Sequence, residues 1–297
     1  MNNLLSRKAK RVHTVKKRLF FTILIIALVA LMLQAFNYYP WETVKSFCIM
    51  YFYNIKQYHE SALFARGINF FIPSGTETKE KDWYPIMLTF NGDRSFSKYT
   101  GENIELTILY TFGHFDFLKG SSQIYNPSSP YYSSFYGGYA LFYKDNPGKA
   151  WGIDSNGRVD INKLSMIPKF DMEHLVLPSV GCPKDRFSFD FRITNLQENV
   201  CYIGYQDWVC IDAVIDTTGL SHLYSGQKYM GYIQYGKPHP DYYTGVDYPT
   251  TRLFGRVYVR YFKDLGGTFM LYCMAADKSV LEKVDAELLS KASINRN

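Results

Sequence analysis

The sequence predicts an α+β protein with a single N-terminal transmembrane helix, a juxtamembrane helix and a mostly antiparallel β ectodomain that ends in a C-terminal helix. Three observations predict this class. Residues 19–41 are apolar and carry no charge, apolar and polar residues alternate in several segments after residue 83, and aromatic residues make up 18% of the 297 residues. Tyr and Phe favour the half-buried surface of a sheet.

The apolar stretch 19–41 has the length and flanks of a membrane span, since about 20 apolar residues cross a bilayer core. Seven Lys and Arg lie in the tail 1–18, and no acidic residue precedes Glu42. The excess of positive charge predicts a cytoplasmic N-terminus, so we expect the rest of the chain to be extracytoplasmic. A cleaved signal peptide is the alternative, but cleavage after Ala35 would need a small residue where Leu33 stands.

The net charge of +6 comes from the tail rather than from a nucleic-acid-binding surface. Of the 33 Lys and Arg, seven lie in residues 1–18, which leaves 26 against 27 Asp and Glu in the rest. A nucleic-acid-binding face needs clustered cations, and no such cluster follows the tail. We therefore expect no nucleic-acid partner. We expect the tail either to contact anionic membrane lipid or to serve only to orient the span.

Residues 42–72 predict the juxtamembrane helix, with Gly67 as its stop. An apolar stripe recurs at steps of four and three positions; its members are Val44, Cys48, Tyr51, Ile55, Tyr58 and Ala62. The stripe either pairs with another helix, in a dimer or a membrane-protein partner, or it packs on the protein's own domain or the membrane surface. The polar residues 73–83 then form a linker.

Residues 84–297 form the predicted β-rich domain. Apolar residues alternate with polar ones in 104–112, 187–194 and 256–261, which predicts strands with one face on a core and one in water. In the last of these segments Arg256 and Arg260 are on the face expected in water. Shorter strands are expected at 86–90, 139–143 and 209–215, with hairpin turns at Asn156-Gly157 and at 265–268. Asp277 is the expected N-cap of the final helix.

Four cysteines lie in this domain, namely Cys182, Cys201, Cys210 and Cys273. An even number in an extracytoplasmic domain predicts disulfides. Four cysteines allow three connectivities. In one of them Cys201 and Cys210, on neighbouring predicted strands, close a short hairpin, and Cys182 pairs with Cys273. The alternative is that all four are reduced and buried.

Two aromatic-rich loops are the expected ligand-binding surface. Their residues are Tyr131, Tyr132, Phe135 and Tyr136 in one loop and Tyr242 and Tyr243 in the other. Tyr and Phe in loops offer a large contact area at low entropy cost. The alternative is that these rings pack inward and hold the loops down.

These features predict a single-pass, membrane-anchored binding or accessory protein of the cell envelope without catalysis, whose partner is an envelope polymer or a membrane protein. One alternative is an anchored hydrolase or transferase, with candidate groups His114, Asp116, Cys182, Asp216 and His239. Another is a structural subunit of a membrane complex. The histidines are scattered, so no cofactor and no metal ion is expected.

Overall fold

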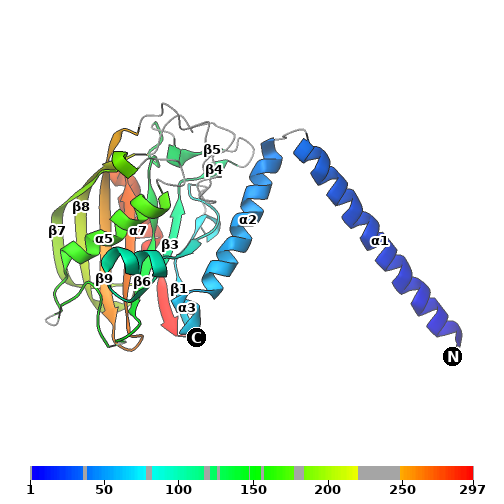
Figure 1. Cartoon of the computed structure of the whole chain (residues 1–297), viewed down its shortest axis with the longest axis horizontal. Coiled ribbons are helices and arrows are strands. Elements are labelled where there is room, and N and C mark those ends of the chain that lie inside the picture. The colour runs from blue at the N-terminus through cyan, green and yellow to red at the C-terminus, as the bar shows by residue number, and fades with distance from the viewer. Residues whose placement is uncertain are drawn as a thin grey trace.

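A computed structural model describes residues 2–35, 39–77, 82–116, 121–125, 128–146, 148–154, 157–176, 184–219 and 248–296. It confirms an α+β fold with mostly antiparallel sheets and a C-terminal helix. Helix α1 (Asn2–Ala35) projects away from a globular domain, and helix α2 (Tyr39–His59) lies along that domain (Figure 1). Within the part of the chain that the structure describes, no helix has a window long and apolar enough to be identified as a membrane span.

A seven-stranded antiparallel sheet forms the centre of the domain, in the order β2-β3-β6-β10-β9-β8-β7. In that order the strands are β2 (Leu88–Asn91), β3 (Ile104–Phe112), β6 (Phe135–Tyr143), β10 (Gly267–Ala275), β9 (Thr250–Phe262), β8 (Tyr205–Thr218) and β7 (Phe189–Tyr202). Each of the six segments predicted as strands overlaps a strand of this sheet. The hairpin expected at 265–268 forms, since β9 pairs with β10. At the other expected hairpin Ile153 pairs with Val159, and Asn156 of its turn lies outside the described residues.

Two small sheets and several short helical turns complete the domain. Strand β1 (Ile68–Phe71) pairs with β11 (Ser293–Arg296), and β4 (Phe115–Asp116) pairs with β5 (Ser121–Ser122). The 3₁₀ turns are η1 (Gly75–Glu77), η2 (Gln123–Tyr125), η4 (Lys184–Arg186) and η8 (Leu289–Lys291), and η3 (Met172–Val176) is a π-helical turn.

Helices cover both faces of the central sheet. Helices α4 (Asp93–Thr100) and α5 (Ile161–Asp171) pack on one face, together with Met50 of α2. Helices α3 (Ala62–Ala65) and α7 (Lys278–Glu287) pack on the other, beside β1 and β11. Every residue of β6 and β10 is therefore buried. The expected water-facing polar side is wrong for β3, where Thr107 and Thr111 are also buried, because the sheet is the middle layer of three.

Local sequence signals explain several boundaries. The Asp277 side chain accepts a hydrogen bond from the backbone N–H of Ser279 and starts α7, as predicted. Asp160 starts α5 in the same way by accepting from Lys163 N. Gly138 in β6 leaves room for the ring of Phe70, since a Cβ there would lie 2.4 Å from the ring. The small residue lets β1 cross closely over the sheet.

The expected helix over 42–72 is shorter in the structure and is followed by other elements. Helix α2 ends at His59, and Ser61 caps the separate short helix α3. Gly67 has a φ of 61°, in the left-handed region, and the chain then turns into β1. The start of the expected linker is tied to the domain, because Pro73 O accepts a hydrogen bond from the Tyr136 hydroxyl.

Candidate functional site

The first aromatic loop packs inside the domain. Tyr131, Tyr132, Phe135 and Tyr136 are all buried. Trp83 packs edge-on against Tyr131 and Tyr136, with ring centroids 5.3 and 4.8 Å apart. These four residues therefore do not form the expected exposed contact surface, because Tyr131 and Tyr136 pack with Trp83 on one face of the sheet and Tyr132 and Phe135 pack in the core on the other. Tyr242 and Tyr243 lie outside the described residues, so the prediction for the second loop stays a prediction.

The expected disulfide between Cys201 and Cys210 is wrong, because both residues are free thiols. The strand register sets Cys210 opposite Gln197 and Trp208 opposite Val200, so the two cysteines do not face each other. Cys210 is buried and Cys201 is exposed. Directly opposed residues on antiparallel strands are the ones close enough for bridging.

The second expected disulfide, between Cys182 and Cys273, is not formed either. Cys273 is a fully buried free thiol in β10. Burial raises the pKa of this thiol, so it stays neutral and packs as a small apolar side chain. Cys182 lies outside the described residues.

The groups considered for a hydrolase or transferase are not brought together where the structure describes them. Asp216 on β8 is held by Arg252 through two hydrogen bonds of 2.8 and 2.9 Å. His114 follows β3, which is four strand positions away from β8 in the sheet, or roughly 19 Å. The Asp116 side chain, Cys182 and His239 are outside the described part. No group of three His, Cys, Asp or Glu that could hold a metal ion occurs among the described residues.

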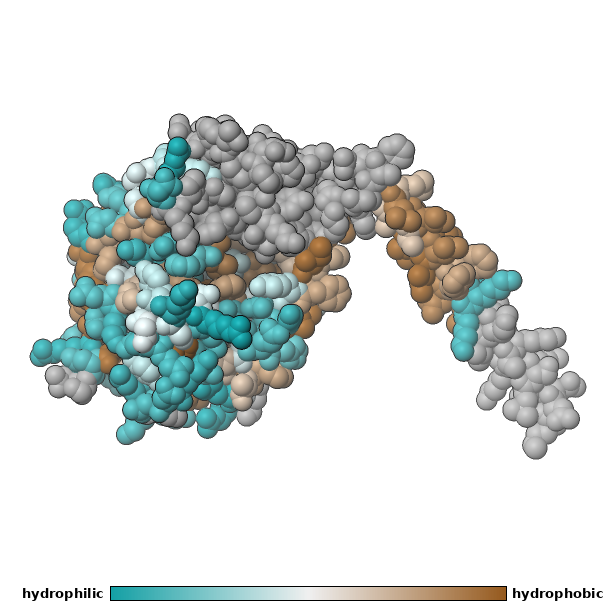
Figure 2. Space-filling view, viewed as in Figure 1, coloured by the Kyte–Doolittle hydropathy of each residue, from teal (hydrophilic) through white to brown (hydrophobic). Residues whose placement is uncertain are grey.

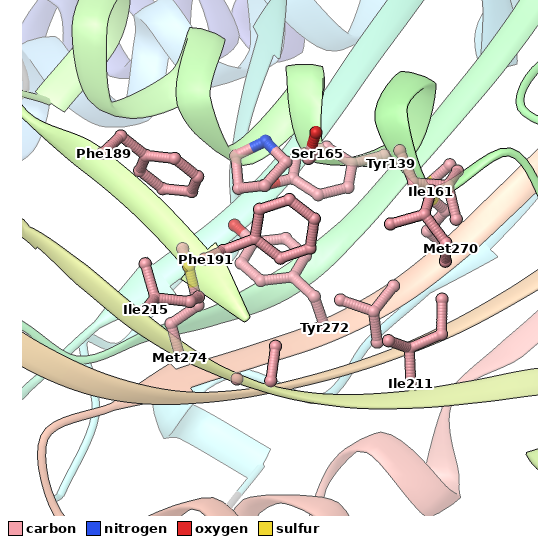
Figure 3. A pocket seen from close by; sticks show the side chains of 15 residues that line it. Tyr139, Ile161, Ser165, Phe189, Phe191, Ile211, Ile215, Met270, Tyr272 and Met274 are labelled. Carbon is pink, nitrogen blue, oxygen red and sulfur yellow. The ribbon is translucent and has the colours of Figure 1, made fainter. Parts of the chain in front are cut away.

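A narrow apolar slot lies between α5 and the central sheet, and no sequence pattern pointed to it. It has a volume of about 60 Å³ (Figure 3). Its walls come from α5 and five strands: Tyr139, Ile161, Leu164, Ser165, Pro168, Phe189, Phe191, Ile211, Ala213, Ile215, Gly255, Val257, Met270, Tyr272 and Met274. Three of these fifteen side chains carry a polar atom, so the slot favours an apolar occupant over water.

The slot exists because the β7–β8 side of the sheet extends beyond the helix that covers it. Phe189 and Phe191 of β7 are half-buried and flank the opening, whereas Met270 and Met274 of β10 are buried in the floor. Small residues keep the space open. A Cβ on Gly255 would lie 2.9 Å from the Ile215 side chain. Pro168 lacks the N–H of a helix interior, and the π-helical turn η3 follows one turn later.

A buried carboxyl group lies beside the slot. The Tyr139 hydroxyl donates a 2.6 Å hydrogen bond to Asp171 Oδ2, while Asp171 Oδ1 is buried without a hydrogen-bond partner in the structure as described. Burial raises the pKa of Asp171 to about 7. The rings of Tyr139 and Tyr272 stack with centroids 4.5 Å apart, and burial raises the pKa of both phenols.

This arrangement suits binding better than bond cleavage. Near neutral pH both the neutral and the charged form of Asp171 are populated. The raised pKa of Tyr139 keeps its hydroxyl protonated in this range, so it remains a hydrogen-bond donor. The third polar side chain of the slot, Ser165, donates its hydroxyl proton to Asn162 O at 2.8 Å. The slot therefore offers an apolar cavity with phenol groups at one end.

A second, wider hollow lies over the loops at one end of the sheet, with Lys163 and Arg260 in its lining. Its polar groups are engaged within the protein. Lys163 forms a 2.7 Å ion pair with Glu102, which also accepts from Trp151 Nε1. Arg260 donates to Gln206 O at 2.7 Å. These contacts hold the loops together, so the apolar slot is the stronger candidate site.

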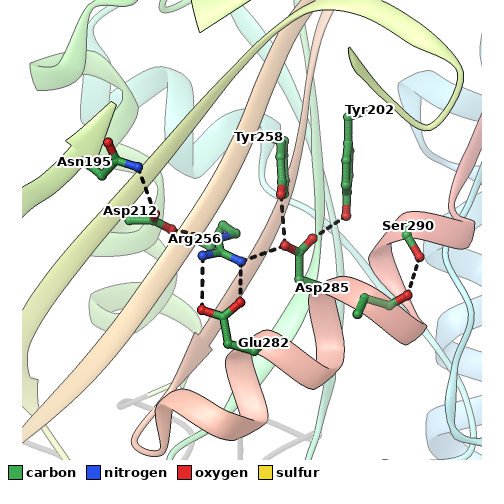
Figure 4. A network of polar contacts seen from close by, with 9 residues as sticks. Asn195, Tyr202, Asp212, Arg256, Tyr258, Glu282, Asp285 and Ser290 are labelled. Atoms are coloured by element: carbon green, nitrogen blue, oxygen red, sulfur yellow. Dashed lines mark hydrogen bonds and ion pairs between the residues drawn. The ribbon is translucent and has the colours of Figure 1, made fainter. Parts of the chain in front are cut away.

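A polar network on the opposite face holds α7 against the sheet (Figure 4). Arg256 of β9 forms ion pairs of 2.7, 2.9 and 2.7 Å with Asp212, Glu282 and Asp285. Asp285 also accepts from the hydroxyls of Tyr202 and Tyr258. The sequence predicted that Arg256 faces water, and that prediction is wrong, because α7 covers it. Burial lowers the pKa of Arg256, but the three carboxylates raise it by more, so the guanidinium stays charged. We interpret the network as structural.

Comparison of the chain with protein-family models, with curated proteins and with solved structures gives no match, so its function has to be argued from the residues and geometry of the chain itself.

Proposed function

We propose that this chain is a single-pass, membrane-anchored binding protein of the cell envelope. Its N-terminus is cytoplasmic, its α+β domain is extracytoplasmic, and the domain acts by binding rather than by catalysis. The apolar surface of α1 is the observation that carries the proposal, and the slot beside Asp171 supplies the binding site.

Helix α1 presents hydrophobic side chains on all its sides. Its eleven large hydrophobic residues between Leu19 and Met32 are each between 42% and 65% exposed. Figure 2 shows a hydrophobic band on the visible side of this helix, next to a hydrophilic patch. A helix that is apolar all round belongs in a protein core or a bilayer. The charge-free sequence continues to residue 41, which supports a bilayer.

Thiol labelling in intact cells tests the anchor and its orientation. The exposed Cys201 of the domain should react with a membrane-impermeant maleimide, whereas a Ser6→Cys variant should react only after permeabilisation. The protein should also stay with the membrane pellet in alkaline carbonate. Release into the supernatant, or labelling of position 6 in intact cells, would contradict the proposal.

The slot supports an apolar group as the ligand, such as part of a lipid chain or a hydrophobic side chain of an envelope partner. Its volume of about 60 Å³ accommodates a small part of such a molecule. Apolar walls leave water without hydrogen-bond partners there, so a hydrophobic group gains by displacing it.

Xenon is a suitable probe for the slot, because dry apolar cavities in proteins bind it. In the full chain in lipid nanodiscs, isotope-labelled methyl groups of Met270 and Met274 should shift as xenon is added. The methyl group of Met50, which lies on α2, is the internal control. An Ala213→Leu variant fills the slot and should abolish the shifts. Equal shifts in both proteins would show that the slot is not the site.

A further inference from the structure

The inner face of α2 is fixed to the edge of the central sheet. Met50 is buried and accepts from the Tyr84 hydroxyl at 3.4 Å. The Asn54 amide donates to Met87 O at 3.1 Å and accepts from Thr89 N. The side-chain oxygen of Gln57 accepts a hydrogen bond from Asn91 N at 2.9 Å, and the backbone oxygen of Gln57 accepts one from the Asn91 side chain. The rotation of α2 about its axis is therefore fixed by its contacts with β2.

The outer face of α2 is apolar and uncovered by the domain. It consists of Val44, Cys48, Tyr51, Phe52 and Ile55, all exposed, with Phe52 at 69%. Four of these five residues belong to the apolar stripe seen in the sequence. The part of the stripe from Val44 to Ile55 therefore points away from the protein's own domain, whereas Ala62 at its end is buried in the core. A helix face in contact with water is normally polar, so this face requires an apolar or interfacial contact.

The outer face of α2 lies in a stretch with few charged residues. Between Glu42 and Glu60 the charged residues are Lys45 and Lys56, and Lys56 forms a 3.8 Å pair with Glu60. Aromatic rings with flanking lysines are typical of helices that lie in the headgroup region of a bilayer.

The outer face of α2 is on the side of this helix from which α1 extends. Helix α1 ends at Ala35 and α2 begins at Tyr39. Figure 1 shows α2 between the globular domain and α1, so the side of α2 that is free of the domain is the side from which α1 extends. A bilayer that holds α1 is therefore within reach of the outer face.

We infer that the outer face of α2 lies in the headgroup region of the bilayer and forms a second membrane contact that fixes the domain against the lipid surface. This inference rests on the proposed anchor. The domain would not swing on a free tether. It would present one defined side to the membrane, because α2 is bound to both the sheet and the lipid.

A nitroxide label on the full chain in vesicles tests this contact. The vesicles contain phosphatidylcholine with a minor share of phosphatidylglycerol. A Phe52→Cys variant is made with Cys48, Cys182 and Cys201 replaced by Ser, since Cys210 and Cys273 are buried. The matched control is Glu198→Cys in the same background. This exposed position is on β7, at the opposite edge of the sheet from β2.

At position 52, oxygen should relax the label several times more strongly than a water-soluble nickel chelate does. At position 198 the order should be reversed. If position 52 behaves like position 198 while the protein still floats with the vesicles, the inference is wrong and the anchor stands. The spectrum of the label at position 52 could instead be broadened by a neighbouring label, and this broadening would disappear on dilution with unlabelled protein. That result would mean that a second copy covers the face, which also overturns the inference. Protein that fails to float with the vesicles would overturn the anchor and the inference together.

Discussion

The side-chain amide of Asn54 accepts a hydrogen bond from Thr89 N of the edge strand β2 and donates one to Met87 O, just before that strand. Gln57, one turn later, continues the same pairing at Asn91. A helix thus occupies the hydrogen-bonding edge where another strand would otherwise add. Open sheet edges invite association, and side chains from a covering helix prevent it.

Replacing Asn54 with Ala should destabilise the domain by about 1–3 kcal/mol, because two backbone groups at the Thr89 end of β2 lose their partners. Urea unfolding of the full chain in detergent measures the effect. Lys56→Ala, on the exposed part of the same helix, is the control and should be close to neutral. Equal stability of the two variants would mean that the amide contacts contribute little.

The buried Asp171 predicts a fall in stability with rising pH. Its pKa is about 7 in the folded protein, against about 4 in an unfolded chain. Between these values the folded protein holds a proton that the unfolded chain has released, so the free energy of unfolding decreases as pH rises. The neighbouring Tyr139, Tyr272 and Tyr110 stay neutral in this range. The total loss is on the order of 4 kcal/mol.

An Asp171→Asn variant should remove this slope and be more stable than the wild type above neutral pH. Thermal unfolding at several pH values between about 4 and 8 tests the expectation. The control is Asp216→Asn. The Arg252 side chain lowers the pKa of Asp216, so any stabilisation from that pair is lost only below the ordinary range of an Asp. A wild-type slope in Asp171→Asn would refute the assignment.

Replacing Arg256 with Met should be strongly destabilising, by about 3 kcal/mol or more, because it leaves Asp212 and Asp285 close together without their shared cation. Arg252→Met removes an exposed pair and should have little effect. If both variants behave alike, the buried network does not hold α7 in place.

Thiol reactivity distinguishes the cysteines of the domain without any substitution. In the native, unreduced protein, iodoacetamide should modify the exposed Cys201 but not Cys210 or Cys273. Burial raises the pKa of Cys210 to about 11, so little thiolate is present. All three should react after denaturation without a reductant, as read by peptide mass spectrometry. Failure of Cys201 to react after denaturation would restore the disulfide hypothesis.

The regular elements were predictable because each signal is local. The alternation of Ile104 to Phe112 gives β3 with the same bounds, and Asp277 marks the start of α7. Helix α5 was missed because Pro168 lies inside it and argues against a helix. The continuation of the helix beyond His59 was overpredicted, because nothing between Ser61 and Gly67 revealed that β11 would supply a strand partner.

The candidate slot could not be predicted for a different reason. Its lining comes from one helix and five strands, and Met270, Ile211 and Phe191 look like ordinary core residues in the sequence. Asp171 is one of 27 acidic residues and has no motif around it. The space arises from how far the β7–β8 hairpin extends beyond α5, which is a property of packing. The first aromatic loop was wrongly predicted to be exposed for the same reason. The Trp83 ring that packs on Tyr131 lies about 50 positions earlier in the chain, so the contact is not visible in the local sequence.

The pairing of β1 with β11 has a consequence for biogenesis. Ile68 faces Arg296, about 230 positions later, so this contact is among the most nonlocal in the fold. During synthesis, β1 emerges long before its partner strand exists. The domain therefore completes its native structure late, after residues 293–296 are available, and until then β1 has an unpaired strand edge that a chaperone would recognise.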